Sequence, residues 1–204
     1  MDLSRAEELQ EVLTSIVDFP IRDCSPKSQL SKTLAVSSLQ FAAAIRVLCG
    51  SGLVLGAGVT LRAQYEAIVR SVWALYRATE SQVQRLSADL TLESQQASKN
   101  IPTVNAMIRE LENVPQLENL LISLNEFKSS SWGPLNSFVH SGIHVVHWTK
   151  NGAPPQLLET IFRSSNGLTL ISFQLLGILT GRQYIQSEIF SAATSYGNIL
   201  PNAK

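Results

Sequence analysis

The chain has 204 residues, of which 45% are hydrophobic and 16% charged, and its 16 basic residues balance 16 acidic ones. This length and apolar content favour one compact domain with a large core. A duplex-DNA binder usually carries a basic excess, so the zero net charge argues against duplex DNA as a partner.

The start of the chain is polar and acidic, unlike the basic and apolar start of a signal peptide. Of the two most apolar stretches, residues 34–61 are interrupted by Arg46 and four glycines, and residues 168–180 fall short of the roughly 20 residues that a spanning helix needs. Cys24 and Cys49 are too few for a disulfide framework, which favours free thiols in a reducing compartment. We therefore expect a cytoplasmic protein that makes no membrane contact.

Helical periodicity dominates from the N-terminus onward. An amphipathic helix within residues 1–24, which we expect to be peripheral, should end before Pro20. Ser25 followed by Pro26 is typical of a helix start and predicts a second helix to about Cys49. A third long helix is predicted from about residue 53 to 79, although Gly56 and Gly58 weaken its start.

The second half of the chain continues the pattern. We predict a polar helix over residues 81–97, a short helix over 104–111 and a further helical segment over 117–124. Residues 129–134, rich in serine and ending in Gly-Pro, predict a turn. After it we expect a histidine-bearing helix ending near residues 149–152, a long apolar helix to about 180 with a kink or packing notch at 165–167, and a last helix over about 184–199. No convincing strand pattern is found. The predicted fold is all-α, a single-domain helical bundle of about seven to nine helices spanning residues 1–204.

All three histidines lie within residues 136–147. If this segment is one helix, Asn136, His140, His144 and His147 share one face. Three interpretations of this stripe remain open. The histidines could satisfy structural hydrogen bonds between helices, or bind a metal ion with Glu66 from another helix as a further ligand. They could also perform acid–base chemistry without a metal, because histidine exchanges a proton near neutral pH.

A second polar stripe lies on the third helix, where Arg62, Glu66 and Arg70 follow one another at steps of four. Such residues form either ordinary surface ion pairs or a polar cleft that faces the histidines. In the second case Arg62 would stabilise charge on a phosphate, while Glu66 positions Arg62.

The predicted catalytic residues are therefore His140, Asn136, Arg62 and Glu66. Asn136 would orient His140 or hold a substrate oxygen. We assign His144, Tyr65 and Arg70 to substrate binding, and no metal or other cofactor to the site.

Two resemblances follow from these residues. Arg62, Tyr65 and Glu66 on one helix, with Asn136, His140 and Gly142 later, resemble an uncharacterised bacterial all-helical domain family of unknown function over about residues 34–181. The Asn136–His140 spacing also resembles part of the signature of HEPN-type helical ribonucleases. That resemblance implies metal-free RNA cleavage at a dimer interface.

The HEPN pattern places an arginine four to six residues before the histidine, often directly before the asparagine. Here Leu135 precedes Asn136, and residues 130–134 contain no arginine. If the resemblance holds, Arg62 would have to supply the missing cation from another helix.

Three functions are consistent with the sequence. The first is a protein of bacterial defence or toxin type that acts on or binds RNA or nucleotides, active or degenerate. The second is a non-catalytic homodimeric interaction module with a buried network of His, Arg and Glu residues. The third is a metal-dependent helical enzyme. A homodimer is expected for the first two, because the apolar helices need to be covered.

Overall fold

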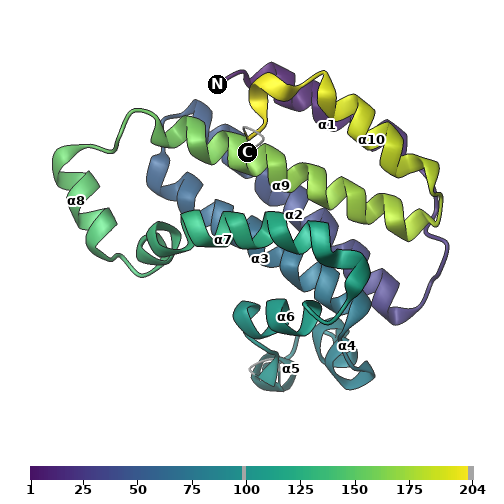
Figure 1. The fold of residues 1–204 in the computed structure, drawn as a ribbon. Coiled ribbons are helices and arrows are strands. Elements are labelled where there is room, and N and C mark those ends of the chain that lie inside the picture. The colour runs from purple at the N-terminus through teal and green to yellow at the C-terminus, as the bar shows by residue number, and fades with distance from the viewer. Residues whose placement is uncertain (98–99, 202–204) are drawn as a thin grey trace.

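The computed structural model describes residues 1–97 and 100–201, and all regular structure in these residues is helical (Figure 1). This confirms the predicted all-α class. The ten α-helices of the described residues are α1 (Leu3–Val17), α2 (Pro26–Gly50), α3 (Val54–Tyr76), α4 (Glu80–Ser87), α5 (Leu92–Ala97), α6 (Val104–Leu111), α7 (Glu118–Val139), α8 (Ile143–Asn151), α9 (Leu157–Thr180) and α10 (Tyr184–Thr194).

The core is built on three long helices, α2, α3 and α9, each of which packs on the other two. Their largest buried side chains include Tyr65, Trp73 and Phe173. Hydroxyl pairs join the helices within this core: Ser31 lies 3.2 Å from Ser71, and Ser38 lies 2.9 Å from Ser172. Because such contacts are directional, they specify the register of the helices in addition to the burial of apolar surface.

The N-terminal helix belongs to the core and is not peripheral as predicted. α1 packs on α9 and α10, and Figure 1 shows α1 and α10 running side by side along α9. Leu9 and Leu13 of α1 are fully buried. The N-terminus of α1 is capped by Asp2, whose side chain accepts a hydrogen bond from the backbone N–H of Arg5.

α4, α5 and α6 lie on the side of the bundle away from α1 and α10 (Figure 1). The single polar helix predicted over residues 81–97 is in fact two helices, separated by residues 88–91. α6 has the predicted bounds, and its Glu110 accepts a hydrogen bond from the indole N–H of Trp73 on α3 at 2.7 Å.

α7 contradicts the predicted turn over residues 129–134, because it continues through them with Pro134 in its interior. Leu135 and Phe138 are buried after the proline. A proline inside a helix costs about 3 kcal/mol or more, so the packing of these two side chains must outweigh the lost hydrogen bond.

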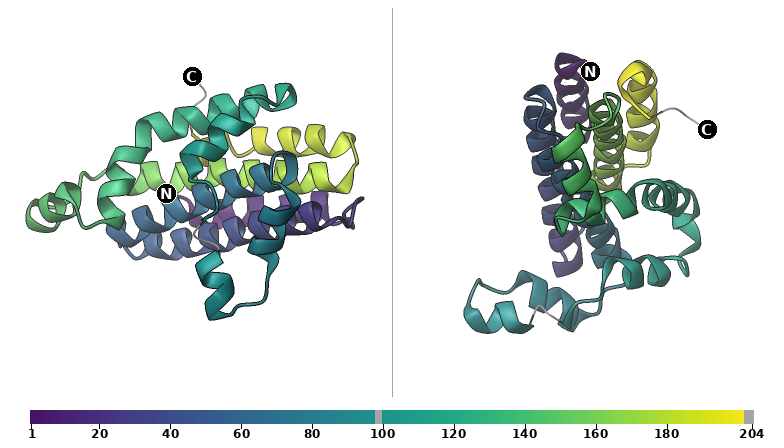
Figure 2. Two further views of the ribbon diagram at one scale, coloured as in Figure 1. Left: turned by 90° about the horizontal axis from the view of Figure 1, so that it is seen from below. Right: turned by 90° about the vertical axis from the view of Figure 1, so that its left-hand side faces the viewer.

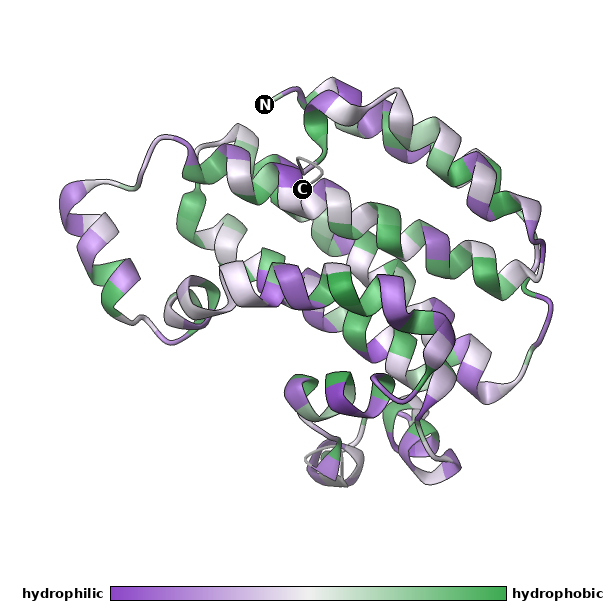
Figure 3. Cartoon of the chain, in the orientation of Figure 1, coloured by the Kyte–Doolittle hydropathy of each residue, from purple (hydrophilic) through white to green (hydrophobic). Residues whose placement is uncertain are grey.

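α8 projects from one end of the molecule (Figures 1 and 2). None of its nine residues, all of which the structure describes, is buried. Its main neighbour is α7. The hydropathy colouring in Figure 3 shows that this outlying helix nevertheless carries hydrophobic residues.

α9 runs without a break through residues 165–167, so these form a packing notch and not a kink. A side chain at Gly167 would collide with Pro201 of the C-terminal segment, which lies against α9 at this point. The predicted last helix is shorter than expected, since α10 ends at Thr194 and is followed by a 3₁₀ turn, Gly197–Ile199.

One helix in the described residues, α2, is long and apolar enough to cross a membrane by length and composition alone. In the structure it packs against α3 and α9. Both cysteines are free thiols: Cys24 is exposed and Cys49 is buried, and burial raises the pKa of Cys49 to about 11.

Candidate functional site

The arginine stripe of α3 forms a charged cluster, as its spacing predicts. The Nε of Arg62 donates to a carboxylate oxygen of Glu66 at 2.9 Å, and a guanidinium nitrogen of Arg70 lies 3.7 Å from the other oxygen. One carboxylate is therefore shared by two guanidinium groups, which leaves one positive charge in excess. Arg77, which ends α3, lies exposed at its cap.

The cluster reaches α7 through Arg62. A terminal nitrogen of Arg62 donates to the amide oxygen of Asn136 at 2.7 Å, and the guanidinium carbon stands 4.6 Å from the centre of the Trp132 ring. The side chain of Arg62 is only 17% exposed. The structure thus brings together the two distant segments that the sequence singled out, and the cation–π contact adds to the hydrogen bond.

The histidine stripe is not one helical face, contrary to the prediction. α7 ends at Val139, and a left-handed Ser141 with φ +49° turns the chain before α8 begins. The N–H of Gly142 donates to the carbonyl of Ser137 at 2.7 Å, and that of Ser141 to the carbonyl of Phe138 at 3.3 Å. This pair of bonds is the Schellman motif, which usually has glycine at the left-handed position. Serine at that position hid the helix end from a pattern-based prediction.

His140 and Asn136 therefore share the last turn of α7, whereas His144 and His147 belong to α8. His140 is exposed, and its imidazole has no hydrogen bond or ion pair within residues 1–97 and 100–201. The imidazole remains open to solvent and to a ligand, one helical turn from the amide that Arg62 contacts.

His144 and His147 have separate surroundings. The ring of His144 packs edge-on against Phe138 and Trp148, with centroid distances of 6.4 and 5.3 Å, and its Nδ1 is buried without a partner in the described residues. The Nδ1 of His147 lies 3.2 Å from the side-chain nitrogen of Asn151. In the described part of the chain no three His, Cys, Asp or Glu side chains are grouped as metal ligands. The metal-site interpretation therefore has no ligand set there.

Two of the predicted substrate-binding residues differ sharply in exposure. Tyr65 is fully buried, stacks on Phe127 and donates its hydroxyl to the carbonyl of Leu124 at 3.1 Å. Burial raises the pKa of its phenol, and the side chain has no exposed surface in this structure. The side chain of Arg70 is 41% exposed, and its Nε is buried without a partner in the described residues. The exposed part of the Arg70 side chain is therefore accessible to a ligand, whereas its buried Nε is not.

Trp132 is the residue that sequence reasoning missed. It precedes Asn136 by four positions, so both lie on one face of α7, and its ring also meets Tyr65 edge-on at 6.0 Å. The turn wrongly predicted over residues 129–134 concealed this relation. The cluster is a surface junction: a hollow of about 660 Å³ lies between α6 and α7, and neither Arg62 nor His140 lines it.

Comparison with known proteins gives one match. A model for a family of unknown function, DUF6988, matches residues 35–202. No curated protein and no solved structure matches the chain.

Proposed function

The chain belongs to the DUF6988 family, and we propose that this member binds phosphate groups of RNA or nucleotides where α3 meets α7. The hydrogen bond between Arg62 and Asn136 carries the proposal, because it joins the arginine stripe to the helical turn that holds His140. Arg70 and His140 would contact the ligand, and Arg62 would position them.

The chemistry of these groups supports phosphate as the ligand. A planar guanidinium group pairs with two phosphate oxygens at once, and Arg70 is the accessible guanidinium of the cluster. His140, one helical turn beyond Asn136, would add a donor at the opposite end of the cluster from Arg70. Since one carboxylate faces two arginines here, an approaching anion meets a local positive charge on a protein whose net charge is zero.

Cleavage of RNA would be a further step at the same site. The HEPN resemblance requires a cation near the asparagine and histidine, and the contact of Arg62 with Asn136 supports α3 as its source. His140 would then act as the acid or base without a metal ion, and Arg62 would stabilise the developing charge.

The first experiment measures binding of a fluorescent single-stranded RNA and of ATP to the whole chain. Arg70→Ala and His140→Ala should weaken RNA binding, and Arg70→Ala should reduce the slope of affinity against salt by about one. His147→Ala is the matched control, since His147 is equally exposed but lies on α8. The proposal fails if wild-type protein binds neither ligand, or if both site variants bind as tightly as the control. Loss of any RNA cleavage in His140→Ala, with unchanged helicity, would establish the acid–base role.

One observation favours the second function, a non-catalytic module with an internal polar network. Arg62 already donates to Glu66 and Asn136 and rests on Trp132, so it also clamps α3 to α7. In that case Arg62→Met would lower the melting temperature, while RNA or ATP would leave the melting temperature of wild-type protein unchanged.

A further inference from the structure

α8 packs against α7, where the ring of Trp148 stands 5.2 Å from that of Phe138, but its outer face is apolar. Ile143 is 78% exposed and Val146 is 64% exposed, and Val139 at the end of α7 is also exposed. This outer face of α8 has no cover in the described part of the chain.

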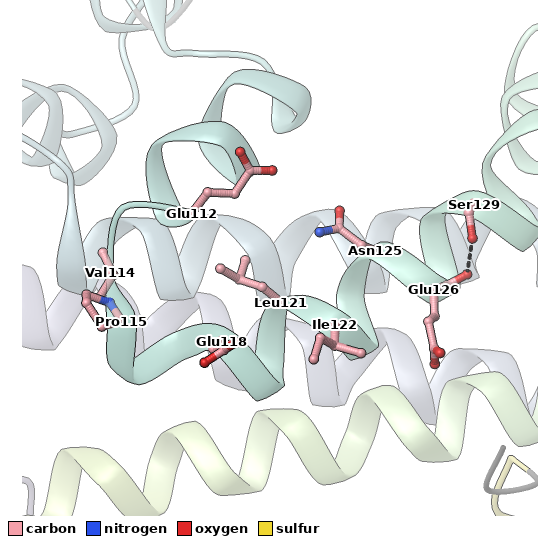
Figure 4. Close-up of a pocket in the computed structure, with 9 residues that line it drawn as sticks. All are labelled: Glu112, Val114, Pro115, Glu118, Leu121, Ile122, Asn125, Glu126 and Ser129. Atoms are coloured by element: carbon pink, nitrogen blue, oxygen red, sulfur yellow. Dashed lines mark hydrogen bonds between the residues drawn. The ribbon is translucent and has the colours of Figure 1, made fainter.

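The same chain has a surface of complementary character between the end of α6 and α7. Figure 4 shows this hollow, in which Leu121 and Asn125 of α7 lie across a gap from Glu112. Its volume is about 660 Å³. Its apolar lining includes Ile122, which is 54% exposed.

The charges of α8 and of the hollow are opposite. Three carboxylates line the hollow, those of Glu112, Glu118 and Glu126, and its described lining includes no lysine or arginine. α8 carries Lys150 and two histidines and no acidic residue. Apolar contact would thus be accompanied by attraction between Lys150 and the acidic rim.

We propose that the occupant of this hollow is α8 of a second copy of the chain, in a twofold dimer. α7 has 22 residues with Pro134 in its interior, and Figure 2 shows that it bends before its C-terminal end. α8, which follows the bend, projects from the end of the molecule, where the hollow of a second copy can reach it. Twofold symmetry would form the contact between α8 and the hollow twice.

The oligomeric state of the whole chain tests the proposal. Light scattering should give twice the chain mass of 22.3 kDa, and the dimer should weaken as salt rises. Ile143→Asp and Ile122→Asp should each give the monomer mass with unchanged helicity, because both side chains are exposed in the single chain. Phe190→Asp, at an equally exposed position on α10, is the matched control and should remain dimeric. A monomeric wild-type protein, or a dimer that survives both Asp variants, would overturn the proposal.

A cross-link then tests which surfaces meet. In a background with exposed Cys24 replaced by serine, the single variants Val146→Cys and Ile122→Cys are mixed and oxidised. A disulfide-linked dimer should form from the mixture and not from either variant alone. Linkage of one variant to itself, or a dimer without the mixed cross-link, would contradict the arrangement. RNA binding measured on monomeric Ile143→Asp separates this proposal from the phosphate site, which needs no second copy.

Discussion

At the scale of single residues, the absence of a side chain decides how closely α3 and α7 approach each other. A methyl group at Gly58 would overlap the ring of Phe138, which is buried between α3 and the α7–α8 turn. Gly133 lies within a helix too, but the space around its missing side chain is open in the described structure. The two glycines therefore predict different costs for one chemical change.

Gly58→Ala should destabilise the protein. Overpacking a filled site costs typically about 1–3 kcal/mol, which exceeds the gain in helix propensity of roughly 1 kcal/mol. Gly133→Ala, the matched control, meets no packed side chain, but a residue with a Cβ before Pro134 is disfavoured in a helix, so the change in the free energy of unfolding should be smaller than for Gly58→Ala. Urea unfolding measures both. A stabilised Gly58→Ala would mean that the Phe138 ring moves aside at little cost.

At the scale of the elements, buried polar pairs fix how α3 and α9 align. The side-chain nitrogen of Gln64 donates to the carbonyl of Ser165 at 3.0 Å, and the hydroxyl of Ser165 donates back to the Gln64 amide oxygen at 2.7 Å. Both side chains are buried. Each one therefore depends on the other for its hydrogen bonds.

Ser165→Ala should destabilise the fold by about 1–3 kcal/mol, because the amide oxygen of Gln64 loses its donor without regaining water. Adding Gln64→Leu should cost less than the two single changes summed, since the double variant has no orphaned oxygen at this position. Thermal and urea unfolding of the four proteins in the cycle give the coupling energy. Strict additivity would show that water or another group replaces the lost donor.

The bounds of most helices could be predicted from local chemistry. The Ser25-Pro26 start and the segment between Pro102 and Pro115 gave helices close to those observed, because capping and proline act within a few residues. α7 could not be predicted in the same way. Its continuation through Pro134 depends on the burial of Leu135 and Phe138 by other helices, and tertiary packing of that kind leaves no local signal.

In the candidate site, too, the features set by local spacing could be predicted, and those set by tertiary packing could not. The Arg62–Glu66 pair follows from helical spacing. Arg62 was expected in a cleft facing the histidines; in the structure it donates to Asn136, and the described residues show no contact between Arg62 and His140. The common face expected for the three histidines failed because the chain turns at Ser141. Tyr65 was assigned to substrate binding, whereas its side chain is buried in the core.

At the scale of the whole molecule, stability is unevenly distributed. α3 is central, with twelve of its residues buried, and α8 has none. Local opening is easiest where few apolar contacts hold a segment, so the two helices should exchange amide hydrogens at very different rates.

Hydrogen exchange of monomeric Ile143→Asp, followed by mass spectrometry, should show rapid exchange in α8 and strong protection in α3. If the proposed dimer forms, wild-type α8 should be slower than in the variant while α3 stays unchanged. Equal protection of α8 in both proteins would show that α7 alone is sufficient to hold it.

The left-handed serine after α7 also restricts geometry. A glycine there would let the chain leave in several directions, whereas a residue with a β-carbon tolerates few backbone angles with positive φ. Ser141 and the two hydrogen bonds around it thus restrict the direction in which α8 leaves the end of α7. A ligand at His140, or a second chain that meets α8, would therefore find α7 and α8 in one fixed relative orientation.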